Sequence, residues 1–159
     1  MDISRINARK IPARYAPARN LTKKDREKAL RAIRKSRRLY TRGTYYPRPH
    51  LASFRSKPSP HVKRAMQQYS VPNMLPTRNL ARKTRCSLKA LRKIVNKGEG
   101  AYYSSGSRPN QTPQSWGYAR LGSALTGGPA SIVDASILRE GCKPNSPALL
   151  AIPNQKQIS

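Results

Sequence analysis

An excess of positive charge is the feature that most constrains this chain. Its 33 lysines and arginines face only six acidic residues, which gives the 159 residues a formal net charge of +27. A compact state of such a chain repels itself, because its surface charges nearly all have one sign. We therefore expect a charge-neutralising partner, which could be nucleic acid, an anionic membrane face or an acidic protein surface.

The chain has few residues with which to build a core. Only 36% of its residues are hydrophobic, and 14 prolines and nine glycines interrupt the sequence. This composition lies close to that of disordered proteins. We predict a mainly α fold, with several short helices joined by long Pro-rich extended segments, a small C-terminal helical core and no substantial sheet. No apolar run approaches the roughly 20 residues of a membrane span, and residues 1–10 lack the apolar stretch of a signal peptide, so we expect a soluble or surface-bound protein.

The charge is concentrated in the first part of the chain. Residues 1–100 hold 28 of the 33 basic residues, so this part is predicted to act through electrostatics and the remainder through packing. The pattern predicts five segments: an extended basic arm (1–20), a basic helix with an irregular linker (21–58), short helices that include a helical hairpin (59–100), a Ser/Gly loop with a two-helix docking module (101–141) and an extended tail (142–159).

A basic helix is predicted over residues 23–40. Thr22 and Asp25 have the spacing of a capping box. The apolar face is thin, and bases of the same sign at i,i+4 destabilise a free helix unless a polyanion screens them. A solvated charged helix is the alternative. The expected polyanion-binding residues are Lys23, Lys24, Arg31, Arg34, Lys35, Arg37 and Arg38.

Short helices are expected to follow. Ser59 and Pro60 form a helix start, and two further helices are predicted over 79–85 and 87–97, joined at Cys86 and ended by Gly98. This pair resembles a helix-turn-helix, but it lacks a turn glycine and a third helix, so a plain helical hairpin is the favoured interpretation. Its expected polyanion-binding residues are Arg82, Lys83, Lys89, Arg92 and Lys93.

The last third of the chain is predicted to dock on a protein partner. A polar loop over 102–113 precedes a helix from Pro113 to about Thr126, and a second helix is expected from Pro129 to Gly141. The tail is interpreted as an extended segment that lies on a partner. The expected docking residues are Tyr102, Tyr103, Arg108, Trp116, Tyr118, Leu121, Leu149, Leu150 and Ile152.

No catalytic, metal or cofactor site is predicted. His50 and His61 have no acid nearby in the sequence, the acids are dispersed, and the glycines do not fit a phosphate-binding loop. We therefore expect no enzyme and no small-molecule substrate. Cys86 and Cys142 could form a disulfide, but two cysteines make neither a zinc site nor a disulfide framework, and two buried thiols are the favoured interpretation.

Several stretches resemble a known family. They are LTKKDREKALRAIRKSRRLYTRGTYYPRP (21–49), SKPSPHVKRAMQQY (56–69), LARKTRCSLKALRKIVNKGEGAYY (80–103) and SSGSRPNQTPQSW (104–116). They resemble an uncharacterised family encoded by nucleocytoplasmic large DNA viruses of the giant and chlorella-virus type. The resemblance implies a virion component, which would be present in the host cytoplasm or nucleus before assembly.

Two functional hypotheses follow. The favoured one is a minor capsid protein that bridges or cements capsid units on the inner side of the shell. Its partners would be the major capsid protein and other minor capsid proteins, with viral DNA or the anionic face of an internal membrane as further candidates. The alternative is a basic core protein that condenses the viral genome, or another nucleic-acid-binding protein with a degenerate helix-turn-helix at 79–97. A ribosome-like RNA-binding protein fits the composition but not the resemblance.

Overall fold

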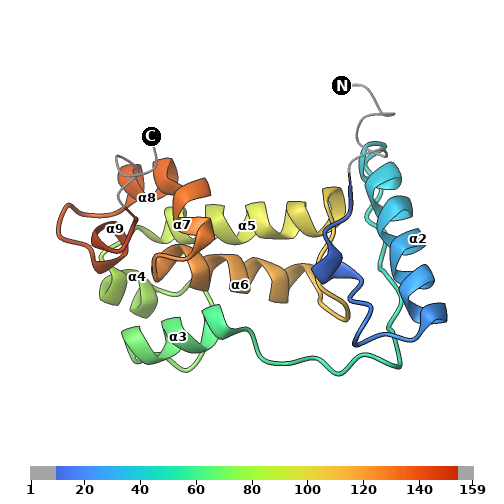
Figure 1. Ribbon diagram of the computed structural model, residues 1–159. Coiled ribbons are helices and arrows are strands. Elements are labelled where there is room, and N and C mark those ends of the chain that lie inside the picture. Colours follow the sequence, from blue (N-terminus) through green and yellow to red (C-terminus); the bar gives the residue numbers. More distant parts are fainter. Residues whose placement is uncertain (1–9, 154–159) are drawn as a thin grey trace. The chain divides into compact units, whose positions relative to one another are not determined.

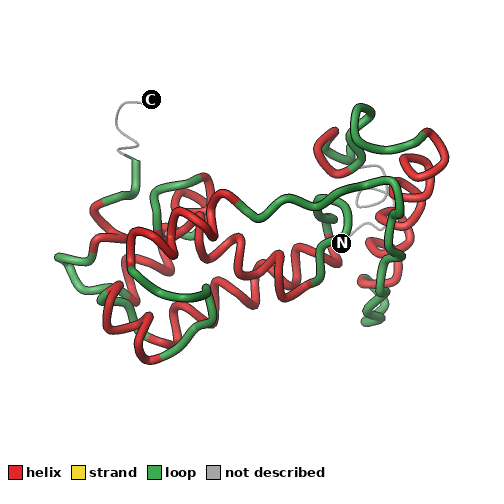
Figure 2. The backbone as a smooth tube through the Cα atoms, turned by 90° about the horizontal axis from the view of Figure 1, so that it is seen from below, coloured by secondary structure: helices red, strands yellow, loops and turns green. Residues whose placement is uncertain are grey.

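The computed structural model describes residues 10–153, and the predicted mainly α fold is confirmed (Figure 1). Within that range the chain forms helices and loops and no strand (Figure 2). The helices are η1 (Ala13–Tyr15, a 3₁₀ turn), α2 (Lys23–Tyr40), α3 (Pro60–Tyr69), α4 (Arg78–Thr84), α5 (Leu88–Ser104), α6 (Pro113–Leu125), α7 (Pro129–Val133), α8 (Ala135–Gly141) and α9 (Pro147–Leu150).

The chain divides into two compact units that are interleaved in the sequence. The first unit contains the described residues up to Lys57 together with Glu99–Pro113, and the second contains Pro58–Gly98 and the residues from Gln114 onward. Helix α5 contributes residues to both. Segments far apart in the sequence therefore share a unit, which the distribution of charge along the chain does not indicate.

The first unit is built around α2. The hydroxyl of Thr22 accepts the amide N–H of Asp25 at 3.1 Å, as the sequence predicts for an N-cap. Asp25 does not complete the capping box; its carboxylate accepts the N–H and O–H of Ser53, at 3.0 and 2.6 Å. The helix is not basic all round, because it buries one continuous face. The buried residues of this face are Ala29, Ala32, Ile33, Ser36 and Arg37.

The predicted N-terminal arm is partly packed in the same unit. Residues 1–9 of that segment lie outside the described residues. After them, η1 places Tyr15 and Ala16 in buried positions, so this part is not a free extended arm. Ala16 joins a small apolar cluster with Leu21, Ala29 and Leu51.

The second unit contains the larger core. Ser59 caps α3 with Pro60 at its first position, and Ser87 caps α5, as the sequence predicts. The core is not limited to the C-terminal helices, because α3, α4 and α5 supply much of it. Its fully buried members are Ala65, Leu91, Ile94, Leu121, Ala124, Leu125, Leu138 and Ala148.

Gly98 does not end a helix, contrary to the sequence prediction. Helix α5 continues through Gly98 and Gly100 to Ser104, so the loop that was expected from Tyr102 begins three residues later, at Ser105. A Cβ atom at Gly98 would lie 2.6 Å from the Cα atom of Gly117 on α6. The missing side chain therefore allows two helix backbones to approach each other, and it is not a cap.

The C-terminal part differs from its prediction in two ways. The expected helix from Pro129 to Gly141 is interrupted at Asp134, whose φ and ψ of −102° and 20° separate α7 from α8. The described part of the tail is not extended, since Ser146 caps the short helix α9. Residues 154–159 lie outside the described part of the chain.

Cys86 and Cys142 form a disulfide, so the prediction of two thiols is wrong. Around it the backbone N–H of Ser87 donates to the carbonyl of Gly141 at 2.7 Å, and the N–H of Lys143 donates to the carbonyl of Arg85 at 2.9 Å. The two cysteines are thus the facing, non-hydrogen-bonded pair of a short antiparallel bridge, the pair type in which Cα atoms come closest. Their Cα atoms are 3.9 Å apart.

Candidate polyanion-binding surfaces

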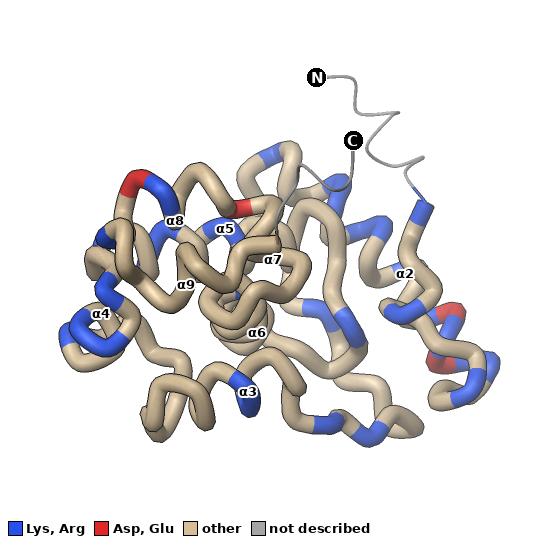
Figure 3. Tube along the Cα trace, turned by 60° about the vertical axis from the view of Figure 1, so that its left-hand side comes forward, with Lys and Arg blue, Asp and Glu red and all other residues tan. Residues whose placement is uncertain are grey.

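One face of α2 carries a row of exposed bases, which we call the α2 stripe: Lys24, Arg31, Arg34, Lys35 and Arg38. The last four recur at i, i+3, i+4 and i+7, the spacing of a single helix face. Figure 3 shows basic residues recurring along this helix. At 1.5 Å per residue the stripe is about 21 Å long. Lys23, also predicted, is exposed in the first turn.

Aromatic rings accompany the stripe in the first unit. The ammonium of Lys35 lies 4.7 Å from the centroid of the Tyr46 ring. Tyr103 stacks on Tyr40 with ring centroids 6.0 Å apart, and Tyr45, which is 66% exposed, lies 5.0 Å from Tyr103. Tyr103 was predicted to dock on a protein, but it is half-buried in this ring cluster. Exposed aromatic rings beside cations can stack on nucleic-acid bases.

Arg37 is wrongly predicted as a polyanion contact. Its exposure is 2%, and its Nε–H donates to the carbonyl of Ser105 at 2.8 Å. The position lies four residues after Ile33 on the buried face of α2, so its side chain points into its own unit. The i+4 spacing from Ile33 is the sequence signal that could have separated Arg37 from its exposed neighbours Lys35 and Arg38.

A second group of exposed bases lies on the second unit and is called the hairpin patch. It contains the five residues predicted there, Arg82, Lys83, Lys89, Arg92 and Lys93, all of which are exposed. The patch also includes two further exposed bases, Arg85 and Lys143, which line a hollow with Arg82 beside the disulfide. Sequence reasoning missed this pair as site residues, because Lys143 approaches α4 only through the Cys86–Cys142 bridge.

Short-range contacts shape the hairpin turn and orient its bases. Arg85 adopts a left-handed conformation with φ 58° directly after α4, where a glycine is more usual. The Nζ of Lys83 donates to the carbonyl of Ser70 at 2.7 Å, and Nη2 of Arg82 donates to Asn79 at 2.9 Å. These bonds orient the two side chains and leave their positive charge uncompensated.

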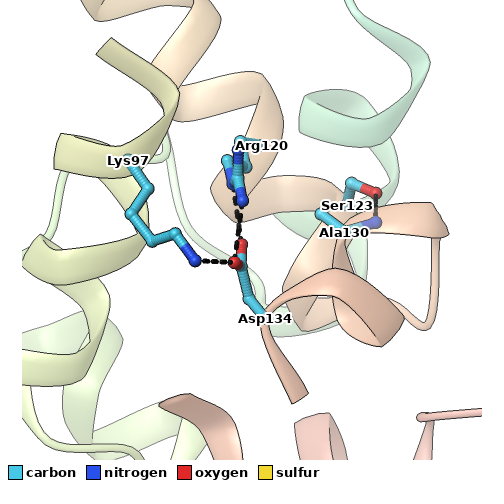
Figure 4. Close-up of polar contacts among 5 residues, drawn as sticks. All are labelled: Lys97, Arg120, Ser123, Ala130 and Asp134. Atoms are coloured by element: carbon cyan, nitrogen blue, oxygen red, sulfur yellow. Dashed lines mark hydrogen bonds and ion pairs between the residues drawn. The ribbon is translucent and has the colours of Figure 1, made fainter. Parts of the chain in front are cut away.

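Ion pairs between two described residues all involve Asp134, which is fully buried (Figure 4). Arg120 approaches both carboxylate oxygens, with Nε–Oδ2 at 2.7 Å and Nη2–Oδ1 at 2.8 Å, and Nζ of Lys97 is 3.1 Å from Oδ1. Burial by itself raises the pKa of Asp134, but the hydrogen bonds from Arg120 and Lys97 outweigh it, so the pKa lies below its ordinary value. This carboxylate joins α5, α6 and the α7–α8 junction.

Nearby, Ser123 joins α6 to α7. Its hydroxyl accepts the backbone N–H of Ala130 at 3.1 Å (Figure 4). Its carbonyl accepts the N–H of Gly128 at 2.8 Å. This polar cluster therefore holds the helices of the second unit together. It uses one of the few acids of the chain, and in the described part of the molecule no base of the stripe or the patch forms an ion pair with a carboxylate.

Most residues predicted to dock on a partner belong to the protein's own cores. Tyr102 and Leu121 are buried, with exposures of 3% and 0%. Leu149 and Ile152 pack against the core of the second unit. The docking prediction is therefore wrong for Tyr102 and Leu121, which their own units cover. Leu149 and Ile152 are only half-buried, and their docking stays a prediction.

The other predicted docking residues retain some access to solvent. Leu150 is 75% exposed and Arg108 is exposed, while Trp116 and Tyr118 are half-buried. Among residues 10–153 no three His, Cys, Asp or Glu side chains gather as a metal site would require. No helix in the described range is both long and apolar enough to cross a membrane.

The chain belongs to a family that is described as a family of unknown function (DUF5824), whose model matches residues 12–135. The matched range includes the α2 stripe and all of the hairpin patch except Lys143. No curated protein and no solved structure matches the chain.

Proposed function

We propose that this protein is a non-enzymatic structural component of a large DNA virus particle, and that its basic surfaces bind the phosphate backbone of the viral nucleic acid. This gives the genome-binding hypothesis precedence over the capsid hypothesis. One observation carries the preference: the α2 stripe and the hairpin patch are exposed and form no ion pair with a carboxylate among the described residues. Of the apolar residues expected to dock on capsid proteins, Tyr102 and Leu121 are buried and five others are half-buried.

The charge density of the α2 stripe suits a polyphosphate. Duplex DNA carries one negative charge per about 1.7 Å of its axis, so a 21 Å length presents about 12 phosphates. Five exposed cations on one helix face can each neutralise a phosphate and release its counterion. The exposed ring of Tyr45 adds a surface on which an unpaired base can stack.

Salt dependence tests the stripe directly. Binding of the full chain to a 20-base-pair duplex is measured by fluorescence anisotropy at several KCl concentrations. Neutralising four stripe residues should reduce the slope of log K against log salt by about 3.6, because each lost phosphate contact removes about 0.9. The stripe variant carries Arg31→Gln, Arg34→Gln, Lys35→Gln and Arg38→Gln.

A matched control separates a localised site from diffuse attraction. It removes four exposed bases outside both surfaces, through Lys57→Gln, Lys63→Gln, Arg64→Gln and Arg139→Gln. Its net charge equals that of the stripe variant, but its salt slope should stay within about one of the wild-type slope, since it loses no docked phosphate. Equal reductions in both variants would mean that only the net charge matters, and the α2 stripe would not be a site.

A capsid role is the second candidate, and exposed apolar side chains favour it. Val133 on α7 and Leu150 on α9 are 65% and 75% exposed. Purified virions can be stripped with mild detergent and graded salt while the protein is followed by mass spectrometry. Retention with the major capsid protein at high salt, lost in a Val133→Ser/Leu150→Ser variant, would support the capsid role. Release from the DNA in step with rising salt supports the genome-binding proposal.

A further inference from the structure

A cavity of about 190 Å³ lies within the first unit, lined by residues of α2, of the segment 48–51 and of the loop 107–112. We infer that this cavity binds a single phosphate group between the half-buried Arg48 and the exposed Arg108. The inference goes beyond the proposed function, because it concerns a recessed site in place of the exposed stripe and patch. It does not require that the protein bind a duplex.

Arg48 is held in a fixed position in the wall of the cavity. Its guanidinium carbon lies 3.7 Å from the centroid of the Tyr102 ring. Its Nη1 donates to the carbonyl of Tyr102 and, at 3.3 Å, to the hydroxyl of Ser36, while Nη2 donates to the hydroxyl of Ser107 at 2.6 Å. These bonds occupy three of the five N–H groups of a guanidinium, so two remain for a ligand.

The positive charge of Arg48 is only partly compensated. None of its hydrogen-bond partners is a carboxylate. The titratable groups that act on it are tyrosines, which are uncharged at neutral pH, and another guanidinium, that of Arg37. Its carbonyl partner, Tyr102, lies in the last turn of α5, and a helix C-terminus supplies about half a negative charge. Burial lowers the pKa of Arg48, but an arginine remains protonated in a protein. An anion would supply the compensation that the protein lacks.

Arg108 gives the cavity a second cation from the solvent side. It lines the cavity and is exposed, and no hydrogen bond from another described residue fixes its side chain. Arg48 and Arg108 both line this cavity. A phosphate accepts the paired N–H donors that guanidinium groups present. The residue was predicted to dock on a protein, but its position indicates an anion.

The size of the cavity limits the ligand. A volume of 190 Å³ equals the share of about six water molecules, at about 30 Å³ each. It is smaller than the roughly 300 Å³ at which ordinary small-molecule pockets begin. A phosphate with a few attached atoms fits this space, and the rest of a larger ligand would lie outside it, because the cavity is partly open to solvent.

The cavity is formed before a ligand arrives. Asn110 adopts φ 59°, and its side chain accepts the N–H of Leu51 at 2.7 Å and donates to the carbonyl of Leu51 at 3.0 Å. This pair of bonds ties the 107–112 loop to the segment that carries Arg48. A preformed site binds with less loss of conformational entropy.

Inorganic phosphate titrated into the full-length protein in 150 mM NaCl tests the site. Two-dimensional ¹H–¹⁵N NMR follows the Nε–H signal of Arg48 and the backbone amides of the 107–112 loop. We expect saturable shifts with one phosphate bound per chain. Arg108→Gln should raise the Kd at least tenfold, whereas Arg55→Gln, an exposed arginine of the same unit outside the cavity, should leave it unchanged.

A second variant tests the contribution of Arg48. Arg48→Lys retains the charge but loses the planar fork, so the Kd should rise at least tenfold if the far-ultraviolet circular dichroism shows an intact fold. If that variant unfolds, the result with Arg108→Gln decides alone. Shifts that rise linearly without saturation, or equal weakening by Arg108→Gln and Arg55→Gln, would overturn the proposal in favour of diffuse attraction to a basic surface.

The origin of the phosphate is resolved by competition. A short single-stranded oligonucleotide that displaces inorganic phosphate and shifts the same signals would identify a nucleic-acid phosphate as the ligand. If phosphate binds and the oligonucleotide does not displace it, the source is free phosphate or a small phosphorylated molecule. The α2 stripe variant should still bind inorganic phosphate in this assay, so failure of the cavity and failure of the stripe are separate outcomes.

Discussion

Breaking the Cys86–Cys142 disulfide should cause a large loss of stability. The two cysteines are 56 residues apart in the sequence. Closing a loop of about 15 residues stabilises a protein by about 3 kcal/mol at 25 °C and a loop of about 100 residues by about 4.7 kcal/mol, so this bond should contribute about 4 kcal/mol. Both cysteines are buried in the core of the second unit, which gives them little room to separate without loss of packing.

Urea unfolding, followed by circular dichroism at the helix minimum, measures this loss. With a denaturant slope of about 2 kcal/mol per molar urea, removal of about 4 kcal/mol should lower the midpoint by about 2 M. The oxidised protein is compared with the same protein reduced by a phosphine, and with a Cys86→Ala/Cys142→Ala variant. The reductant should leave the midpoint of the variant unchanged, which controls for other effects of the reagent.

Two results would refute this reasoning. A thiol assay on denatured, unreduced protein could find two free thiols per chain, in which case the cysteines do not form the bond. Alternatively, the oxidised and reduced midpoints could coincide, in which case closing the loop contributes nothing measurable. Because disulfides persist in oxidising surroundings, protein prepared in reductant should be the less stable form.

Three further variants test the packing and electrostatics of the helices. Gly98→Ala should destabilise the second unit by about 1–2 kcal/mol in thermal unfolding, because its Cβ would meet the backbone of Gly117. Gly100→Ala on the same helix is the control. Its Cβ would lie 3.4 Å from the hydroxyl of Tyr40, so this change should be neutral or stabilising by up to about 1 kcal/mol. Asp134→Asn should cost about 3 kcal/mol, the lower end for a broken buried pair, because Lys97 is 46% exposed and can turn to water. Because the pKa of Asp134 is lowered in the folded state, this carboxylate stabilises the fold near neutral pH. That stabilisation is lost as the pH falls below about 4 and through the folded pKa. The stability of the Asp134→Asn variant should therefore lack this part of the acid dependence.

The sequence determined where several helices begin. Thr22, Ser59 and Ser87 each cap a helix at the predicted position, because an N-cap bond joins residues only two or three apart and needs no tertiary contact. The mainly α class and the positions of most exposed bases followed from the same local patterns of charge and apolar spacing. These predictions depend on neighbours in the sequence, which the sequence itself supplies.

Only the tertiary structure decided which long-range contacts the residues of a sequence pattern make, on the surface or in the core. The i+4 spacing from Ile33 places Arg37 on the buried face of α2, but only the tertiary structure supplies its partner, the carbonyl of Ser105, 68 residues away. Gly98 resembled a helix end, yet it allows the approach of a second helix. Likewise the cavity of Arg48 and Arg108 needs a loop 59 residues distant to hold its wall. Such contacts depend on which segments meet, and one chain's local pattern does not contain that information.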